Sequence, residues 1–215
     1  MRIKTLILSL CLVMVVLTAA AGTIAYLTDT SSVTNTFTVG NIDMDVNESE
    51  VDENGQKVEN GTPTTGNNYH LIPGKTYSKD PYVTIKAGSD ECYVRMIAKI
   101  TDAADVLAIM GNDFLPQTCV NGWDNTVWVP AGMKVENNEI ICEFRYHTTV
   151  DASESDTNIV LEPLFTELVV PGILTGDQLA KLTDMEIKVI GHAIQTATFD
   201  NAEAAWIAFD AQTGN

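Results

Sequence analysis

The residues best suited to chemistry are the histidines, the cysteines and a large excess of carboxylates. His70, His147 and His192 lie far apart in the sequence, and none has a partner at the spacing of a zinc motif such as H-E-x-x-H. We therefore interpret them as solvated or hydrogen-bonded imidazoles. The sequence also contains no glycine-rich phosphate loop and no G-x-S-x-G nucleophile motif. It predicts no catalytic residue, no metal and no cofactor, so we do not expect an enzyme.

One polar segment has a faint likeness to a cation-binding loop. Glu50, Asp52 and Asn54 precede Gly55, which is the order of side chains in a calcium loop. The twelfth position of that frame is Gly61, where an EF-hand requires a bidentate glutamate, so an EF-hand is excluded. Asn54-Gly55 instead predicts a turn, either within a hairpin or within a mobile loop.

Two tryptophans, Trp123 and Trp128, could form a flat platform for a sugar. Aromatic side chains more often pack in cores and interfaces, so we favour packing. The platform is retained as the basis of an alternative function, a monomeric surface binding module.

The cysteines allow several arrangements. Cys11 falls in an N-terminal leader, which leaves Cys92, Cys119 and Cys142, and three cysteines permit three different single bridges. Cys92 and Cys142 each share a strand face with apolar residues at period two, Val94 and Met96 for the first and Ile140 and Phe144 for the second, so both are predicted to point into the core. They form either two buried thiols or one bridge between sheets, and Cys119 is expected to stay unpaired in a loop.

The first 25 residues have the anatomy of a signal peptide. Arg2 and Lys4 precede an apolar run over residues 6–17, and small residues follow it. Cleavage after Ala21, which releases Gly22, and cleavage after Ala25, which releases Tyr26, both satisfy the small-residue rule. An uncleaved anchor is the other interpretation, because no charge occurs in residues 5–28 and that span is long enough to cross a bilayer.

The rest of the chain is patterned as short strands. The predicted strands cover residues 27–39, 42–46, 82–86, 91–101, 123–129, 139–147, 165–170 and 185–198. Helices are expected at 102–110, with Asp102 as the cap, at 176–182, and at 202–211, with a capping box that begins at Asp200. Alternating faces favour an all-β, antiparallel β-sandwich over residues 26–199, with short connecting helices, followed by a C-terminal helix and tail over residues 200–215.

The segment around the predicted cleavage site carries a family resemblance. Residues 22–45 read GTIAYLTDTSSVTNTFTVGNIDMD, and this sequence resembles the start of the TasA/camelysin (CotN-like) family. The matching residues are Gly22, Thr23, Ala25, Leu27, Asp29, Phe37, Gly40, Ile42 and Met44. The resemblance implies cleavage between Ala25 and Tyr26 by a dedicated, SipW-type signal peptidase, and it implies a jelly-roll topology. It also implies a secreted fibre subunit of a Gram-positive biofilm matrix, cell surface or spore coat.

Camelysin itself has been described as a surface metalloprotease, and that activity is the other alternative function. The missing zinc motif argues against it here.

The same segment predicts how subunits assemble. Residues 26–39 are expected to act as a donor strand that fills the next subunit, with Leu27, Val33, Phe37 and Val39 as the assembly residues. The alternative is that this segment pairs within its own sheet. The expected partners are other copies of the chain, the signal peptidase and accessory matrix proteins. A net charge of −17 disfavours nucleic acid, and the membrane is expected to bind only the leader.

Overall fold

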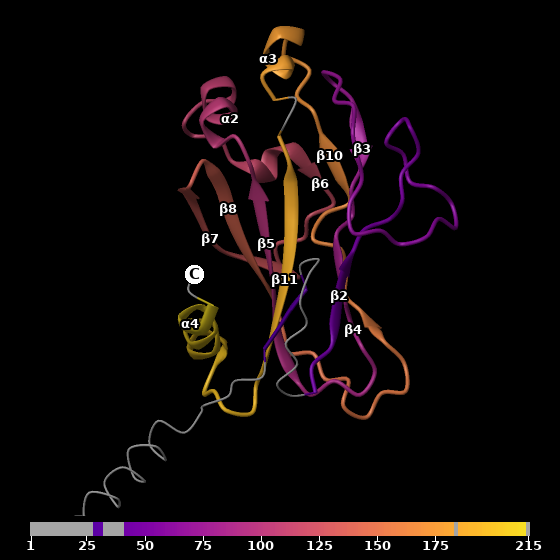
Figure 1. The fold of residues 1–215 in the computed structure, drawn as a ribbon, viewed down its shortest axis with the longest axis vertical. Coiled ribbons are helices and arrows are strands. Elements are labelled where there is room, and N and C mark those ends of the chain that lie inside the picture. Colours follow the sequence, from indigo (N-terminus) through magenta and orange to yellow (C-terminus); the bar gives the residue numbers. More distant parts are fainter. Residues whose placement is uncertain (1–27, 32–40, 183–184, 214–215) are drawn as a thin grey trace, which may run out of the picture.

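A computed structural model of the chain describes residues 28–31, 41–182 and 185–213 (Figure 1). Its strands are β1 (Thr28–Ser31), β2 (Met44–Asn47), β3 (Thr76–Ser78), β4 (Tyr82–Ile85), β5 (Cys92–Ile100), β6 (Val120–Asn121), β7 (Trp128–Glu136), β8 (Glu139–Tyr146), β9 (Ile159–Val160), β10 (Glu167–Val169) and β11 (Ile187–Gln195). Its helices are α2 (Ala103–Met110), the 3₁₀ turn η1 (Pro116–Cys119), α3 (Gly176–Ala180) and α4 (Ala202–Thr213). The all-β class, with few short helices and one C-terminal helix, is confirmed.

The described strands form three sheets, and every pairing between them is antiparallel. The largest sheet has the order β1-β11-β5-β8-β7, and the two smaller sheets have the orders β3-β10-β6 and β2-β4-β9. Figure 1 shows α2 and α3 at one end of the strands and α4 beside the large sheet nearer its other end.

Two long strands form the centre of the large sheet. β5 and β11 pair along their whole length, from Ile187 opposite Ile100 to Gln195 opposite Cys92. β11 is apolar on both faces, and its last five residues are all buried. Strands buried on both faces need such continuous apolar sequence.

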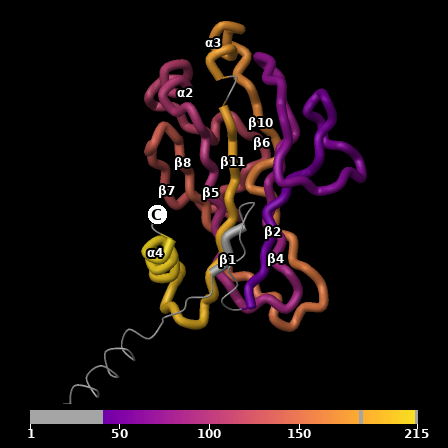
Figure 2. The backbone as a smooth tube through the Cα atoms, viewed as in Figure 1, coloured from indigo at the N-terminus to yellow at the C-terminus, as the bar shows by residue number. Residues whose placement is uncertain are grey.

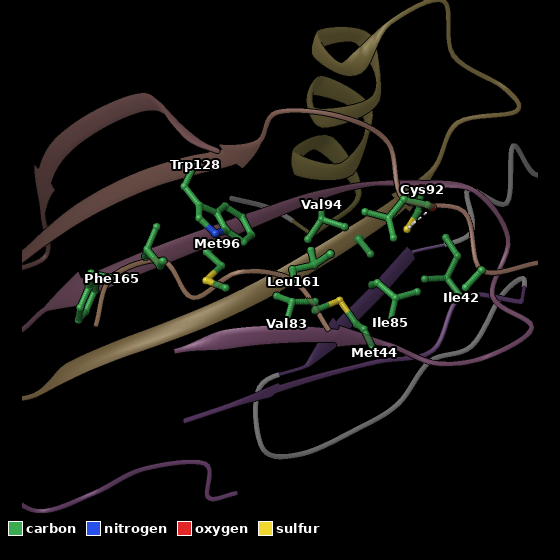
Figure 3. Packing of buried hydrophobic residues seen from close by; sticks show 14 residues of the cluster. Ile42, Met44, Val83, Ile85, Cys92, Val94, Met96, Trp128, Leu161 and Phe165 are labelled. Carbon is green, nitrogen blue, oxygen red and sulfur yellow. Dashed lines mark hydrogen bonds between the residues drawn. The ribbon is translucent and has the colours of Figure 1, made fainter. Parts of the chain in front are cut away.

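The main core lies between the large sheet and the β2-β4-β9 sheet. Met44, Val83 and Ile85 of the small sheet face Val94 and Met96 of β5 (Figure 3). All five side chains are almost completely buried, as the period-two pattern of these strands predicts.

The strand predicted at residues 123–129 is wrong in its position. Trp123 lies in the loop before the strand, and β7 begins only at Trp128 and continues to Glu136. The strand is set by its hairpin partner, because Asn137 and Asn138 both have positive φ (52° and 62°) and join β7 tightly to β8. Two consecutive residues with positive φ are the requirement of a type I′ hairpin turn.

Both predicted helix caps are corrected. Asp102 has a left-handed backbone (φ 54°) and makes no capping hydrogen bond, and the side chain of Asn138 instead accepts from the N–H of Ala104 at 3.0 Å. At α4 the cap is Asn201 rather than Asp200, because the Asn201 Oδ1 accepts from the N–H of Ala204 at 2.9 Å. A cap supplied by another strand leaves no local signal in the sequence.

Candidate assembly site

The predicted assembly segment begins at an edge of the large sheet. β1 pairs only with β11 among the described strands, from Thr28 opposite Ile194 to Ser31 opposite Gly191. Figure 2 shows β1 between β11 and β2. Within this chain the described part of the segment therefore adopts the alternative arrangement, pairing in its own sheet.

Most of the predicted site lies outside the described residues. This holds for the whole leader and for the residues predicted to take part in cleavage and assembly: Ala25, Tyr26, Leu27, Val33, Phe37 and Val39.

A cleft continues from the end of β1. β11 extends four residues beyond the stretch paired with β1, from Ile187 to Ile190, and on that side no described strand pairs with it. A cleft of about 1130 Å³ lies here, with Ile187, Lys188 and Val189 on one wall. The opposite wall includes Val46 and Asn47 of β2, which pairs only with β4 in the described sheets. Beside the cleft, no further strand of the described residues therefore pairs with either of these two edges.

One wall of the cleft is held by a buried ion pair. Lys79 Nζ lies 2.6 Å from Glu48 Oε2, and the two side chains are only 8% and 5% exposed. Asn67 donates a further hydrogen bond to Glu48 at 2.8 Å, and the Lys79 ammonium lies 5.8 Å from the centre of the Tyr69 ring. Burial and the charge of Glu48 raise the pKa of Tyr69, so this phenol stays protonated. The network fixes the loop after β2 against the segment that directly follows β3.

The polar loop predicted between residues 48 and 68 is ordered by this network and by a hairpin. Val51 bridges Lys57, Gly55 has a φ of 70°, and its N–H donates to Asp52 O at 2.9 Å. The hairpin interpretation of Asn54-Gly55 is therefore confirmed. Hydrogen bonds from the backbone of Gln56 and from Asn54 lower the pKa of the Asp52 carboxylate.

A glycine allows the two sheets to approach closely below the cleft. A Cβ built on Gly191 would lie 2.4 Å from Val46 Cγ2 and 2.5 Å from Met44 Cε. No ordinary side chain fits at such distances. Gly191 therefore lets β2 cross close over β11 at the point where β1 ends.

A second cluster surrounds Arg95 and fastens α4 to the sheet. The Arg95 side chain is 1% exposed, and its guanidinium lies 4.5 Å and 4.9 Å from the ring centres of Trp206 and Phe209. It donates to His192 Nδ1 at 3.1 Å and binds both carboxylate oxygens of Asp210. Burial and the neighbouring Arg95 charge lower the pKa of His192 to about 3. His192 is thus a neutral acceptor, in agreement with its interpretation as a satisfied imidazole.

The other residues singled out in the sequence are dispersed. Cys92 and Cys142 are buried free thiols, and Cys119 is a partly exposed free thiol. Of the two arrangements considered for Cys92 and Cys142, the structure has two thiols. Trp128 is fully buried and donates to Glu162 O at 2.8 Å, while Trp123 donates to Trp128 O at 2.9 Å. The pair is packed rather than displayed as a platform.

Two features concern ions and membranes. Among the described residues, no three His, Cys, Asp or Glu side chains gather closely enough to hold a metal ion. No helix within the same residues is long and apolar enough to cross a membrane.

A smaller apolar cavity of about 110 Å³ lies near α2 and η1, with Phe114, Cys119, Trp123 and Cys142 among its lining residues. No polar side chain gathers there in a way that indicates chemistry.

Three structurally important residues escaped the sequence analysis. These are Arg95, Lys79 and Gly191, none of which the sequence analysis identified. Their roles depend on contacts with distant segments, and only a glycine inside an apolar strand could have signalled close approach of another backbone.

Comparison of the chain with protein-family models, with curated proteins and with solved structures found no match.

Proposed function

We propose that this chain is a secreted structural protein that assembles into fibres by exchange of its N-terminal strand between copies. We further propose that it is not an enzyme and that its sheets form a jelly-roll sandwich. The partners are then other copies of the chain, with the dedicated signal peptidase needed for release and accessory matrix proteins as further components. The resemblance to the TasA/camelysin family supports this proposal, and its location would be the extracellular matrix or cell surface.

The observation that carries the proposal is the position of β1. It is a four-residue strand at a sheet edge, and it is followed along β11 by a cleft between two strand edges with which no further described strand pairs. A short edge strand can be exchanged at low cost, because an identical strand from a second copy makes the same backbone hydrogen bonds.

The register supports the assignment of the assembly residues. If the pairing of β1 with β11 continued without interruption, Val33 would lie opposite Val189 and Phe37 opposite Met185. Leu27, Val33, Phe37 and Val39 are all separated by even numbers of residues, so an extended strand presents them on one face. Ser31 lies opposite Gly191, so in this register the four residues share a face of the sheet with Gly191. That face is directed towards β2, because a Cβ built on Gly191 would lie 2.4 Å from Val46 Cγ2. Four apolar anchors on one side of a donor strand would contact the apolar part of the cleft lining, which includes Val46, Ile187 and Val189.

Export and assembly are coupled in this proposal. Cleavage between Ala25 and Tyr26 frees the strand, whereas an intact leader keeps it at the membrane. Exchange between successive copies is a head-to-tail contact that does not close, and such contacts generate filaments rather than dimers. N-terminal sequencing of the secreted form tests the release step, for which we expect a start at Tyr26. A start at Gly22 would refute this site, and an intact Met1 would refute cleavage.

The decisive experiment removes residues 26–36 from the secreted chain and examines it by electron microscopy. We expect a folded protein that forms no fibres and that is incorporated only at fibre ends when mixed with the intact chain. Val33→Asp and Phe37→Asp should also block fibres, while Thr34→Asp, on the opposite face, is the matched control. Fibres of unchanged abundance from the shortened chain would exclude strand exchange.

A further inference from the structure

The opposite edge of the large sheet is also open. β7 pairs only with β8 among the described strands, and Figure 1 shows it as the outermost strand on its side. Eight of its nine residues are exposed. Met133 and Val135 are 50% and 55% exposed although they are apolar. A strand edge with exposed apolar side chains is a template for pairing with another chain.

The hairpin turn determines which backbone groups are free. Glu136 and Glu139 flank the two-residue turn, so they form a hydrogen-bonded pair, and the pairs alternate from there along β7. This alternation turns the N–H and C=O groups of Met133 and Val135 away from β8. These groups would be the backbone donors and acceptors available to another strand.

The two halves of β7 differ in how this edge is protected. Pro130 has no N–H to donate, and the pairing with β8 shifts between Pro130 and Gly132, as in a bulge. Proline and bulges are common devices against edge pairing. Beyond the shift, only Lys134 protects the edge, and it forms a 2.6 Å ion pair with Glu136 on the same exposed face.

We propose that the 134–136 segment of β7 pairs antiparallel with the same segment of a second copy, with Val135 on the two-fold axis. In this register Lys134 of each copy lies opposite Glu136 of the other, which gives two complementary charge pairs. A two-fold axis at Lys134 would place two lysines opposite each other, and like charges directly opposite are destabilising. An axis at Met133 would place Glu136 opposite Pro130, beyond the shift.

This contact is independent of the exchange of β1, since it uses the other edge of the sheet. It is isologous, so it joins copies in pairs. Only Lys134, Val135 and Glu136 of each β7 lie opposite residues of the other β7, and so short a pairing is weak between single molecules. The β7 pairing becomes effective where the exchange of β1 already holds many copies together, because a second contact within one assembly is then intramolecular. Its role would be lateral association.

A disulfide trap tests the register. The experiment uses the full secreted chain with Cys119→Ser, since Cys92 and Cys142 are buried. Opposite residues of a hydrogen-bonded antiparallel pair have Cα atoms about 5.5 Å apart, which suits a disulfide. Val135→Cys should therefore yield a linked dimer under mild oxidation. Val129→Cys is the matched control, since it is 42% exposed on the same strand but has no counterpart in this register.

Charge reversal provides the second arm. In the Val135→Cys background, either Lys134→Glu or Glu136→Lys alone should slow dimer formation by about tenfold, because both cross-strand pairs become repulsive. An equimolar mixture of these two variants should restore it, as mixed dimers regain two opposite-charge pairs. The proposal would be overturned if Val129→Cys formed as much linked dimer as Val135→Cys, or if Val135→Cys formed none. It would also be overturned if mixing the two charge variants did not restore dimer formation. Circular dichroism confirms that every variant is folded.

Discussion

Arg95 shows how a charged residue can be fully buried without being a catalytic group. Alternation along β5 placed it on the polar face, and that assignment of face is correct. The sequence did not indicate that α4 covers this face, because the contact joins residues that are more than one hundred positions apart. Two aromatic rings, one neutral imidazole and the carboxylates of Asp210 and Glu143 then satisfy the charge, as buried ions require.

The low pKa of His192 makes stability depend on pH. Its pKa is about 3 in the folded chain against an ordinary value of 6.5, so the unfolded chain binds a proton in this interval while the folded chain does not. The stability that this group contributes is therefore fully present above pH 6.5 and is lost as the pH falls towards 3. The slope contributed by this single group is at most about 1.4 kcal/mol per pH unit.

We expect His192→Asn to flatten this part of the curve, because asparagine retains an acceptor for Arg95 and does not titrate. The free energy of unfolding is measured by urea titration at intervals between pH 3.5 and 7. Asp210, Glu143 and Lys99 also surround the site, but they are present in both wild type and His192→Asn. Their contributions to the pH dependence therefore cancel when the two unfolding curves are subtracted. His147→Asn, at an exposed position, is the control. Parallel curves for wild type and His192→Asn would contradict a neutral buried imidazole.

The three thiols should react in a fixed order. Burial raises the pKa of Cys92 to about 12 and that of Cys142 to about 11, and neither side chain is accessible. The thiolate is the form that reacts with labelling reagents, so both cysteines should react only after local opening of the structure. Partly exposed Cys119 should be modified first in the native protein, as mass spectrometry of labelled peptides would show. Modification of Cys92 or Cys142 ahead of Cys119 would contradict this placement.

At the scale of elements, prediction succeeded where the pattern is long. Period-two alternation located β5, β8 and β11 closely, because one buried face forces alternation along a whole strand. It failed at β7, where eight exposed residues leave little pattern and the strand is defined by the Asn137-Asn138 turn. The short strands β3, β6 and β9 gave too few residues for a periodic signal.

Gly191 should be the most sensitive position of β11. Gly191→Ala places a methyl group within 2.5 Å of Val46 and Met44, and overpacking of this kind costs about 1–3 kcal/mol. We expect the free energy of unfolding to fall by that amount in a urea titration. Gly132→Ala is the matched control in β7, because a Cβ there meets nothing within 4 Å. A neutral Gly191→Ala would show that β2 does not cross β11 so closely.

At the scale of the whole molecule, the class was predictable and the sheet order was not. Counting short strands indicated an antiparallel all-β chain, since each strand carries its own signal. The order β1-β11-β5-β8-β7 joins strands from both ends of the chain, and no local pattern encodes such a pairing. The cleft at the assembly site follows from that order, so its two walls, from β2 and β11, could not be foreseen.

The net charge of −17 should control the rate at which copies assemble. Like-charged subunits repel over roughly the Debye length, which shrinks from about 10 Å at 0.1 M salt to about 3 Å at 1 M. We therefore expect fibre formation, followed by light scattering, to accelerate as sodium chloride is raised over this range. The double variant Glu59→Lys and Glu154→Lys changes two exposed positions away from both strand edges. It should assemble faster than wild type at low salt and at the same rate at high salt. Slower assembly with added salt would mean that attraction between specific charge pairs outweighs the net repulsion.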